Sequence, residues 1–182
     1  KYLKSLEATK SIFLVTNGQE PDMIQKLQDE DALPTQLYLS TNAADYESFM
    51  KINKPKYDDS WERWNKTLDM LKDLNTRTVL RITLIRDYND QKESIPAFAE
   101  MFRKASPHFI EIKSYMHIGR STNRLEHENM LEMEEVKKFS EEIAKQSKIF
   151  SIMDESIVSR ISILQNNERF IDRYISTYAN TI

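Results

Sequence analysis

Short apolar runs alternate with amphipathic helical patterns through most of the chain, and this alternation restricts the possible folds more than any other feature. Strands that alternate with helices are typical of repeated βα units, in which each helix returns the chain to start the next strand of a parallel sheet. The sequence therefore predicts an α/β fold. The expected strands cover residues 11–16, 36–41, 77–86 and 108–114, and two shorter ones cover 149–153 and 160–164.

Apolar side chains recur at helical spacing between and after these strands, which predicts the helices and assigns their stripes to the core. Asp58, Asp59 and Ser60 are candidate N-caps of the first helix, and Ser94 precedes the second. The stripes are Trp61, Trp64, Leu68 and Leu71; Phe98, Met101 and Phe102; Met133, Val136, Phe139 and Ile143; and, in a closing helix, Phe170, Ile171, Tyr174, Ile175 and Tyr178.

The composition excludes several classes of protein. With 182 residues, 40% of them hydrophobic and 30% charged, the chain is typical of one globular domain. It shows neither a secretory signal nor the roughly 20 apolar residues of a membrane span, so we expect a cytosolic protein without a membrane partner. The absence of cysteine excludes disulfides and thiolate-bound metals. Because the net charge is −3, any contact with RNA must come from a local basic surface.

Successive side chains of a strand point to opposite faces of the sheet, and here one face is apolar and the other polar. In strand 77–86, Leu80, Ile82 and Leu84 share one face, opposite Arg81 and Thr83. If helices cover the apolar face, the polar side chains lie on the concave side. That side either wraps around a ligand or is the wetted second face of an open two-layer sheet, and both interpretations stay open. The polar set is Gln36, Ser40, Arg81, Thr83, Glu111 and Lys113.

The two glycines, Gly18 and Gly119, each stand just past the end of an expected strand. Glycine at such a place allows a tight turn or a close approach of backbone to a ligand. Ligands of α/β proteins bind at the carboxyl edge of the strands, where the loops converge. We expect the site there, although a turn or helix cap is a strong alternative for any single residue. The polar residues at this edge are 16–17, 40–42, 86–89 and 115–120.

Motifs between residues 11 and 164 carry a resemblance to a known family. Thr16-Asn-Gly18 is common to many radical S-adenosylmethionine (SAM) enzymes, whereas Pro34-Thr-Gln-Leu-Tyr38 and Glu111-Ile-Lys-Ser-Tyr-Met-His-Ile-Gly119 are more specific. Together with segments 51–55, 61–63 and 77–85, they resemble the archaeal-like 4-demethylwyosine synthases, which begin the tricyclic wyosine base of phenylalanine tRNA.

The resemblance implies a partial (TIM-like) barrel of parallel βα units. Residues 1–10 resemble the helix before the third barrel strand, so we expect two earlier units upstream, with the cluster cysteines and a substrate-contacting lysine. Barrel units would cover about 1–130 and a family-specific extension about 131–182. The strand at 11–16 would then be an unpaired edge, which favours association.

The resemblance also implies the reaction. The complete enzyme would be a radical SAM lyase that forms 4-demethylwyosine from N1-methylguanosine in tRNA and from pyruvate. Its cofactors would be SAM and a [4Fe–4S] cluster, which together yield a 5′-deoxyadenosyl radical. Because the cluster needs thiolate ligands, this chain alone is expected to be inactive, and the sequence indicates no catalytic residue.

Individual site residues follow from the same resemblance. Ser40 matches a position that contacts the SAM ribose and Arg81 one that faces its methionine or ribose part, which agrees with the chemistry of a hydroxyl and a guanidinium. For His117, a structural role and a substrate contact are equally open. For Glu111 and Lys113, an ion pair with each other or with Arg81 is the alternative to a binding role. The expected cofactor-binding residues are Thr16, Asn17, Ser40, Arg81, Thr83, Tyr115 and Met116, and the substrate-binding residues are Lys54, Lys113, His117 and Arg120.

A tRNA partner requires cations for phosphates and rings for bases, although a solvated charged face is an alternative for each cation. Two other functions also stay open: another radical SAM activity on RNA or a small molecule, and a cluster-less RNA-binding pseudoenzyme. The candidate contacts to the anticodon arm are Lys51, Lys54, Lys56, Arg120 and Arg124 for phosphates, and Tyr57 and Tyr115 for stacking.

Overall fold

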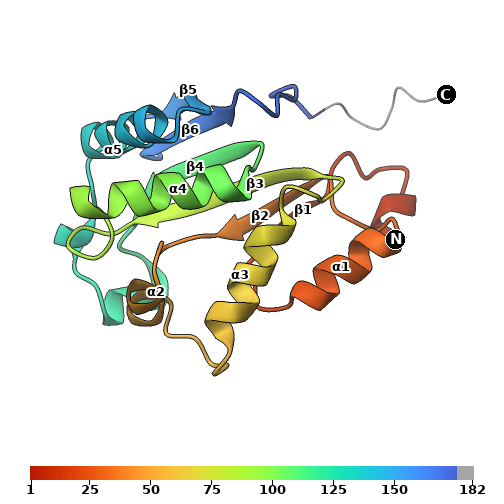
Figure 1. Cartoon of the computed structure of the whole chain (residues 1–182), viewed down its shortest axis with the longest axis horizontal. Coiled ribbons are helices and arrows are strands. Elements are labelled where there is room, and N and C mark those ends of the chain that lie inside the picture. Colours follow the sequence, from red (N-terminus) through yellow and green to blue (C-terminus); the bar gives the residue numbers. More distant parts are fainter. Residues whose placement is uncertain (176–182) are drawn as a thin grey trace.

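The computed structural model describes residues 1–175 and contains one mixed six-stranded sheet in the order β1-β2-β3-β4-β6-β5 (Figure 1). The first four strands are parallel, whereas β6 is antiparallel to both β4 and β5. The α/β class is confirmed. The strands are β1 (Phe13–Thr16), β2 (Gln36–Ser40), β3 (Arg77–Leu84), β4 (Phe109–Ser114), β5 (Phe150–Ser156) and β6 (Ile161–Asn166).

All six strands lie where the sequence predicts them, but the direction of the last two was not indicated. β5 and β6 form a hairpin whose turn includes Arg160 in the left-handed region, at φ 50°. The hairpin returns the chain at once, so β6 enters beside β4 in the opposite direction. A short strand carries no sequence sign of its direction, because parallel and antiparallel strands share the same alternation.

The three clearest helices are confirmed, and two shorter ones were missed. The confirmed helices are α3 (Ser60–Met70), α4 (Ile95–Ala105) and α5 (Met133–Ser147). The missed helices are α1 (Pro21–Asp29), which begins with proline at its first turn, and α2 (Tyr46–Asn53), which Asp45 caps through a 2.9 Å hydrogen bond from Ser48 N. Each buries few residues, so the apolar stripe is weak.

Two expected terminal helices are corrected. Residues 1–10 contain only a 3₁₀ turn, Tyr2–Ser5, that buries no residue. Residues 170–175 are not helical, and Tyr178 lies outside the described residues. In residues 1–10 the apolar side chains have helical spacing but no buried surface to pack against. In residues 170–175, Ile171 packs against the sheet while Phe170 and Tyr174 stay exposed. Short isolated helices are marginal in water.

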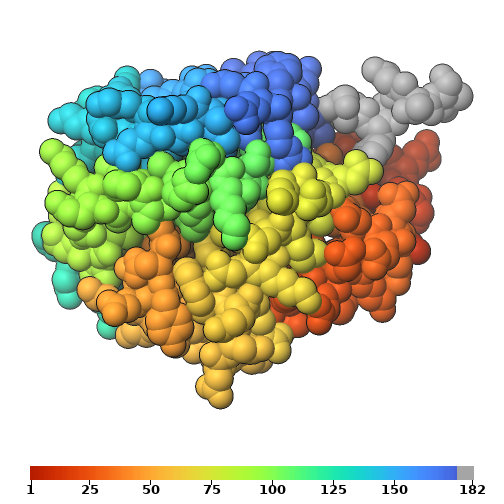
Figure 2. All heavy atoms as spheres, in the orientation of Figure 1, coloured from red at the N-terminus to blue at the C-terminus, as the bar shows by residue number. Residues whose placement is uncertain are grey.

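One face of the sheet packs against the helices and forms the main core. Leu37, Leu80 and Ile110 are fully buried there against Trp64 of α3 and Phe102 of α4. The helices line this side of the sheet, and α3 lies between α1 and α4 (Figures 1 and 2). The prediction that helices cover the apolar face is confirmed, as is the assignment of Trp64 to the core.

The strand β1 is one edge of the sheet and pairs only with β2 among the described residues. Its side chains Phe13, Leu14 and Val15 are 51%, 37% and 45% exposed. The unpaired edge is therefore confirmed, while association through it stays a prediction.

Residues on both sides of the expected boundary near residue 130 share one core. None of the helices in residues 1–175 has the length and apolarity needed to cross a membrane.

Candidate functional site

The polar side chains of β2, β3 and β4 form one row on the face away from the helices. Strand register pairs Ser40 with Arg81 and Arg81 with Glu111, so the three side chains leave the same side of the sheet. Thr83 and Lys113 are paired one step closer to the carboxyl edge. The alternation in the sequence thus predicted correctly which side chains share a face.

Within this row, Arg81 and Glu111 form an ion pair. Arg81 Nε donates to Glu111 Oε1 at 2.7 Å, and Arg81 Nη2 donates to Oε2 at 3.4 Å. The guanidinium also lies over the Tyr38 ring, 4.5 Å from its centroid. Burial, together with the nearby Glu111 charge, raises the pKa of Tyr38 to about 12. The pair therefore holds the Arg81 side chain in a defined place.

The amino half of the same face is not polar. Tyr38, Val79 and Phe109 form a small second core there, covered by Ile163 and Ile171. The segment that follows β6 also lies against the start of β3, because Arg77 donates to backbone carbonyls of residues 172–174. The sequence left two interpretations of this face open, a wall around a ligand or the wetted second face of a two-layer sheet. Neither describes the whole face, because only its carboxyl half is free for a ligand.

A pocket of about 530 Å³ lies at the carboxyl edge of β1 and β2. The loop between α2 and α3, with Lys54 and Tyr57, forms part of its lining, and Trp64 of α3 lines it beside Ser40, to whose carbonyl Trp64 Nε1 donates at 3.1 Å. Its volume is within the usual range for small-molecule sites. The polar residues that line it are Asn17, Gln19, Ser40, Asn42, Asn53, Lys54, Lys56 and Tyr57.

Gly18 shapes the turn after β1 that borders this pocket. Its φ is +75°, and a Cβ atom there would lie 2.7 Å from Leu39 Cδ1, so only glycine fits. Its N–H donates to Thr16 Oγ1, while Gln19 N donates to Asn17 Oδ1. The turn thus ties Thr16 and Asn17 to the backbone. By contrast, a Cβ on Gly119 would meet nothing within 4 Å.

Gln19 contributes an unsatisfied acceptor to the pocket wall. The residue is 8% exposed, and its Nε2 donates to the Ser60 carbonyl at 3.0 Å. Its Oε1 is buried and has no hydrogen-bond partner within residues 1–175. A buried carbonyl oxygen without a donor costs stability, so this atom indicates a place for an incoming donor group.

The remaining expected residues are divided between the pocket and its surroundings. Asn17, Ser40 and Lys54 line the pocket, while Thr16 is paired with Leu39 on the helix side of the sheet. Tyr115 is only 5% exposed, and its hydroxyl lies 3.3 Å from His117 Nδ1, so the Tyr115 ring is not free to stack on a base. The exposed residues are Met116 and Arg120, on the segment after β4.

The asparagines at this edge divide in the same way. Asn89 is buried, and it binds Ile85 N, the Asn42 carbonyl and the Thr83 carbonyl, so it has a structural role. Asn42 both lines the pocket and accepts from Thr83 N at 3.2 Å. The structural role is therefore confirmed for Asn89, while a ligand contact of Asn42 stays a prediction.

Comparison with known proteins now identifies the relatives. A family model described as wyosine base formation matches residues 104–166. The SAM-dependent tRNA 4-demethylwyosine synthase of Methanocaldococcus jannaschii is 42% identical over 162 residues, which are 88% of this chain and 48% of the relative. The chain is homologous to tRNA 4-demethylwyosine synthases. The enzyme of that name from Pyrococcus abyssi is 38% identical over 156 residues, or 86% of this chain and 45% of the relative.

A solved structure supports the same relationship. The structure of TYW1 with a lysine-pyruvate adduct bound matches with a TM-score of 0.76 and 41% identity, over 87% of this chain and 48% of that one. The chain thus spans about half the length of the synthases that it matches.

Sequence reasoning missed two residues that line the pocket of this chain, Gln19 and Asn53. Gln19 directly follows Gly18, so the glycine itself was the signal that pointed to it. Asn53 ends α2, a helix that the sequence did not reveal, and its Oδ1 accepts from Asn42 Nδ2 at 3.2 Å.

Proposed function

We propose that this chain forms the carboxyl-terminal part of a radical SAM tRNA 4-demethylwyosine synthase, a cytosolic lyase of wybutosine biosynthesis. The polar pocket at the carboxyl edge of β1 and β2, in a chain 42% identical to such a synthase, carries the proposal. Because the chain spans about half of that relative, the activity belongs to the complete protein. The curved partial barrel, with an extension from about residue 131, remains part of this proposal.

The pocket residues fit SAM. Ser40 Oγ has no hydrogen-bond partner among the described residues, which leaves it free for a ribose hydroxyl. The buried Gln19 Oε1 suits a hydroxyl or an amino group of the same ligand. When bound, SAM would supply the radical chemistry of the family, and Ser40, Gln19 and Asn17 would orient it.

Arg81 does not line the pocket itself but lies beside Ser40 in the next strand, and it fits the carboxylate of SAM with a further restriction. Its Nε and Nη2 bind Glu111, so only Nη1 is left without a partner in the described part of the chain. A ligand carboxylate would approach that end of the guanidinium, beside Ser40 in the next strand. Thr83 and Lys113, one step further along, would border the substrate, with pyruvate as the expected small molecule.

The iron–sulfur cluster does not fit this chain. No cysteine occurs in the sequence, and residues 1–175 contain no group of three acidic or histidine side chains that could hold a metal. The cluster ligands of the proposed synthase must therefore come from outside this chain, and no step of the reaction is assigned to the residues here.

The test is an Arg81→Ala variant in the complete protein. We expect SAM binding to weaken by about 10- to 100-fold, since a hydrogen bond to a charged group is lost, while tRNA affinity stays within about twofold. Arg103→Ala, which removes an exposed arginine of α4, is the control. Weaker tRNA binding with unchanged SAM binding would overturn the site, and tRNA binding without any SAM cleavage would favour the pseudoenzyme.

A further inference from the structure

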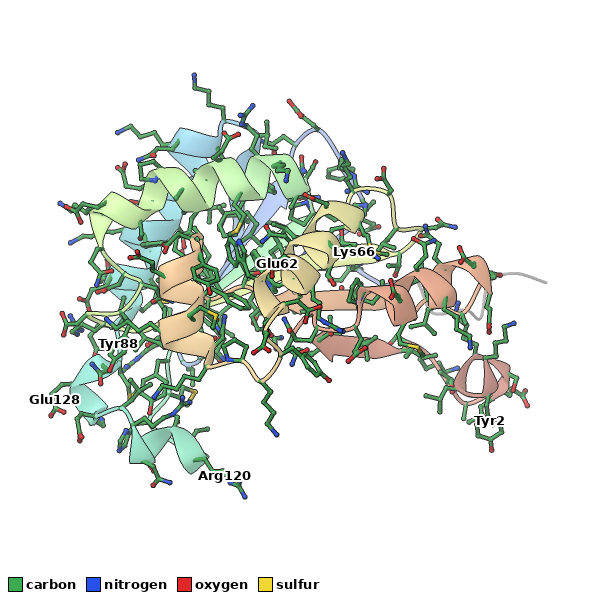
Figure 3. All side chains as sticks on the ribbon, turned by 60° about the horizontal axis from the view of Figure 1, so that its bottom comes forward. Tyr2, Glu62, Lys66, Tyr88, Arg120 and Glu128 are labelled. Atoms are coloured by element: carbon green, nitrogen blue, oxygen red, sulfur yellow. The ribbon has the colours of Figure 1, made fainter. Side chains whose placement is uncertain are left out.

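A second, smaller cleft lies next to the pocket, and cations surround it. Its volume is about 90 Å³. Its walls come from three separate segments: Lys51 and Lys54 at the end of α2, Ile85 and Tyr88 after β3, and Arg124 after the 3₁₀ turn Gly119–Asn123. Tyr88 lies near the segment that carries Arg120 and Glu128 (Figure 3). We call Lys51, Lys54 and Arg124 around Tyr88 the cation cleft.

The charges of the cation cleft are not neutralised by the protein. Lys51, Lys54 and Arg124 form no salt bridge with any of residues 1–175, and no acidic side chain lines the cleft. By contrast, Arg86 at the same edge is paired with Glu135 at 2.6 Å. In a chain with 29 acidic and 26 basic residues, three unopposed cations around one cleft form a local positive potential.

The cleft is also partly ordered before any ligand arrives. Lys51 Nζ lies 5.0 Å from the centroid of the Tyr88 ring, a cation–π contact that holds the ammonium over the ring. Lys51 therefore covers one face of the Tyr88 ring. With three cations and no acidic side chain in its lining, the cleft favours a negatively charged group.

Lys54 connects the cation cleft with the larger pocket. It ends α2 in a left-handed conformation, at φ 45°, and lines both cavities. An RNA strand carries one phosphate per nucleotide, so a nucleotide that reaches the mouth of the larger pocket, where SAM would bind, must place a flanking phosphate within a short distance. Lysine and arginine bind such phosphates without reading sequence.

We propose that the cation cleft binds a backbone phosphate of the RNA next to the nucleotide that lies at the mouth of the larger pocket. The inference rests on the proposed function and adds the place where the RNA strand is held. It assigns this role to Lys51, Lys54 and Arg124 together, three residues that only the fold brings to one place.

The experiment measures tRNA affinity of the complete protein at several salt concentrations. Lys51→Gln and Arg124→Gln are the test variants, because Lys54 borders both cavities. Each should weaken tRNA binding by about 3- to 10-fold and reduce the slope of log affinity against log salt by about 1. Lys72→Gln, an exposed lysine that follows α3 and precedes the amino end of β3, is the matched control and should change neither quantity. Inorganic phosphate, added as a separate ligand, should compete only at millimolar or higher concentration.

The outcomes separate this inference from the proposed function. If the wild-type protein binds and modifies tRNA but both variants keep its affinity and salt slope, the cation cleft is overturned and the proposed function stands. If the variants lose SAM affinity in parallel with tRNA affinity, the cleft belongs to the SAM site and the inference also fails. A wild-type protein that binds no tRNA would overturn the proposed function itself.

Discussion

The two faces of the sheet differ in polarity and in exposure. On the helix side, Leu37, Leu80 and Ile110 are fully buried in one apolar core. On the other side, Arg81 and Glu111 are held beside Ser40 at the same level of the same strands, with the Arg81 side chain 26% exposed. The comparison teaches that one strand can supply stability from one face and a binding surface from the other, because its side chains alternate.

The polar face tolerates charge because its charged groups bind each other. An isolated guanidinium or carboxylate would lose its hydration there without compensation. The ion pair, the Tyr38 ring and the opening toward the carboxyl edge together reduce that cost. The helix face has no such arrangement and is correspondingly apolar. Three predictions test how sharply the faces differ.

The largest effect is expected on the helix face. Leu80→Ala should lower the free energy of unfolding by about 2–5 kcal/mol, because it leaves a cavity in a fully buried core. Thr83→Ala, on the other face of the same strand and partly exposed, should change it by about 0.5 kcal/mol or less. Urea denaturation measures both. Similar losses for the two variants would abolish the distinction between the faces.

An intermediate effect is expected for the ion pair. Glu111→Gln removes the charge that faces Arg81 but keeps the shape of the side chain, and we expect a loss of about 2 kcal/mol in the free energy of unfolding. A double-mutant cycle with Arg81→Met measures the coupling energy. Additive losses would mean that the two side chains are stabilised independently, which would contradict the account of the polar face given above.

The smallest effect concerns a polar residue at the margin of the helix face. His108 Nδ1 accepts from Thr78 N at 3.1 Å, and burial, with the nearby charges of Arg169 and Arg77, lowers the pKa of His108 to about 4. Between this pKa and the ordinary value near 6.5, the unfolded chain binds more protons than the folded chain. The contribution of the neutral His108 side chain to the free energy of unfolding is therefore complete above about pH 6.5 and is lost as the pH falls toward 4.

We expect this group to reduce the free energy of unfolding by about 1 kcal/mol between pH 7 and pH 5, after allowance for its partial exposure. Comparison of His108→Gln with wild type isolates the effect, since the variant should lack that part of the pH dependence. His127→Gln, which removes an exposed histidine, is the control. An unchanged pH dependence in His108→Gln would show that the margin of the helix face is as hydrated as the polar face.

Much of the fold could be predicted from the sequence because the signals were local. Alternation in β3 placed Leu80 and Arg81 on opposite faces, and the stripe through Trp64 and Leu68 predicted α3. The stripe through Phe170 and Tyr174 had the same form, yet residues 170–175 are not helical. Periodicity reports that a segment is able to form a helix, but burial decides whether it does.

The site was less predictable, because it depends on contacts between distant segments. Ser40 and Asn17 were expected from the family resemblance and from their places at the carboxyl edge of the strands, and both line the pocket. Tyr115 was chosen by the same rule but is buried beneath its own loop. The pairing of Arg81 with Glu111 was only one of several possibilities until the register placed the two side chains side by side.

The sequence by itself determined the strands, the three long helices, the face to which each strand residue points and the relationship to wyosine-forming enzymes. These properties follow from local spacing and from motifs that are read along the chain. The tertiary structure alone decided the antiparallel pairing of β6 with β4 and β5, the unsatisfied Gln19 oxygen and the convergence of Lys51, Lys54 and Arg124. Each of these depends on how segments far apart in the sequence come together, which no local pattern contains.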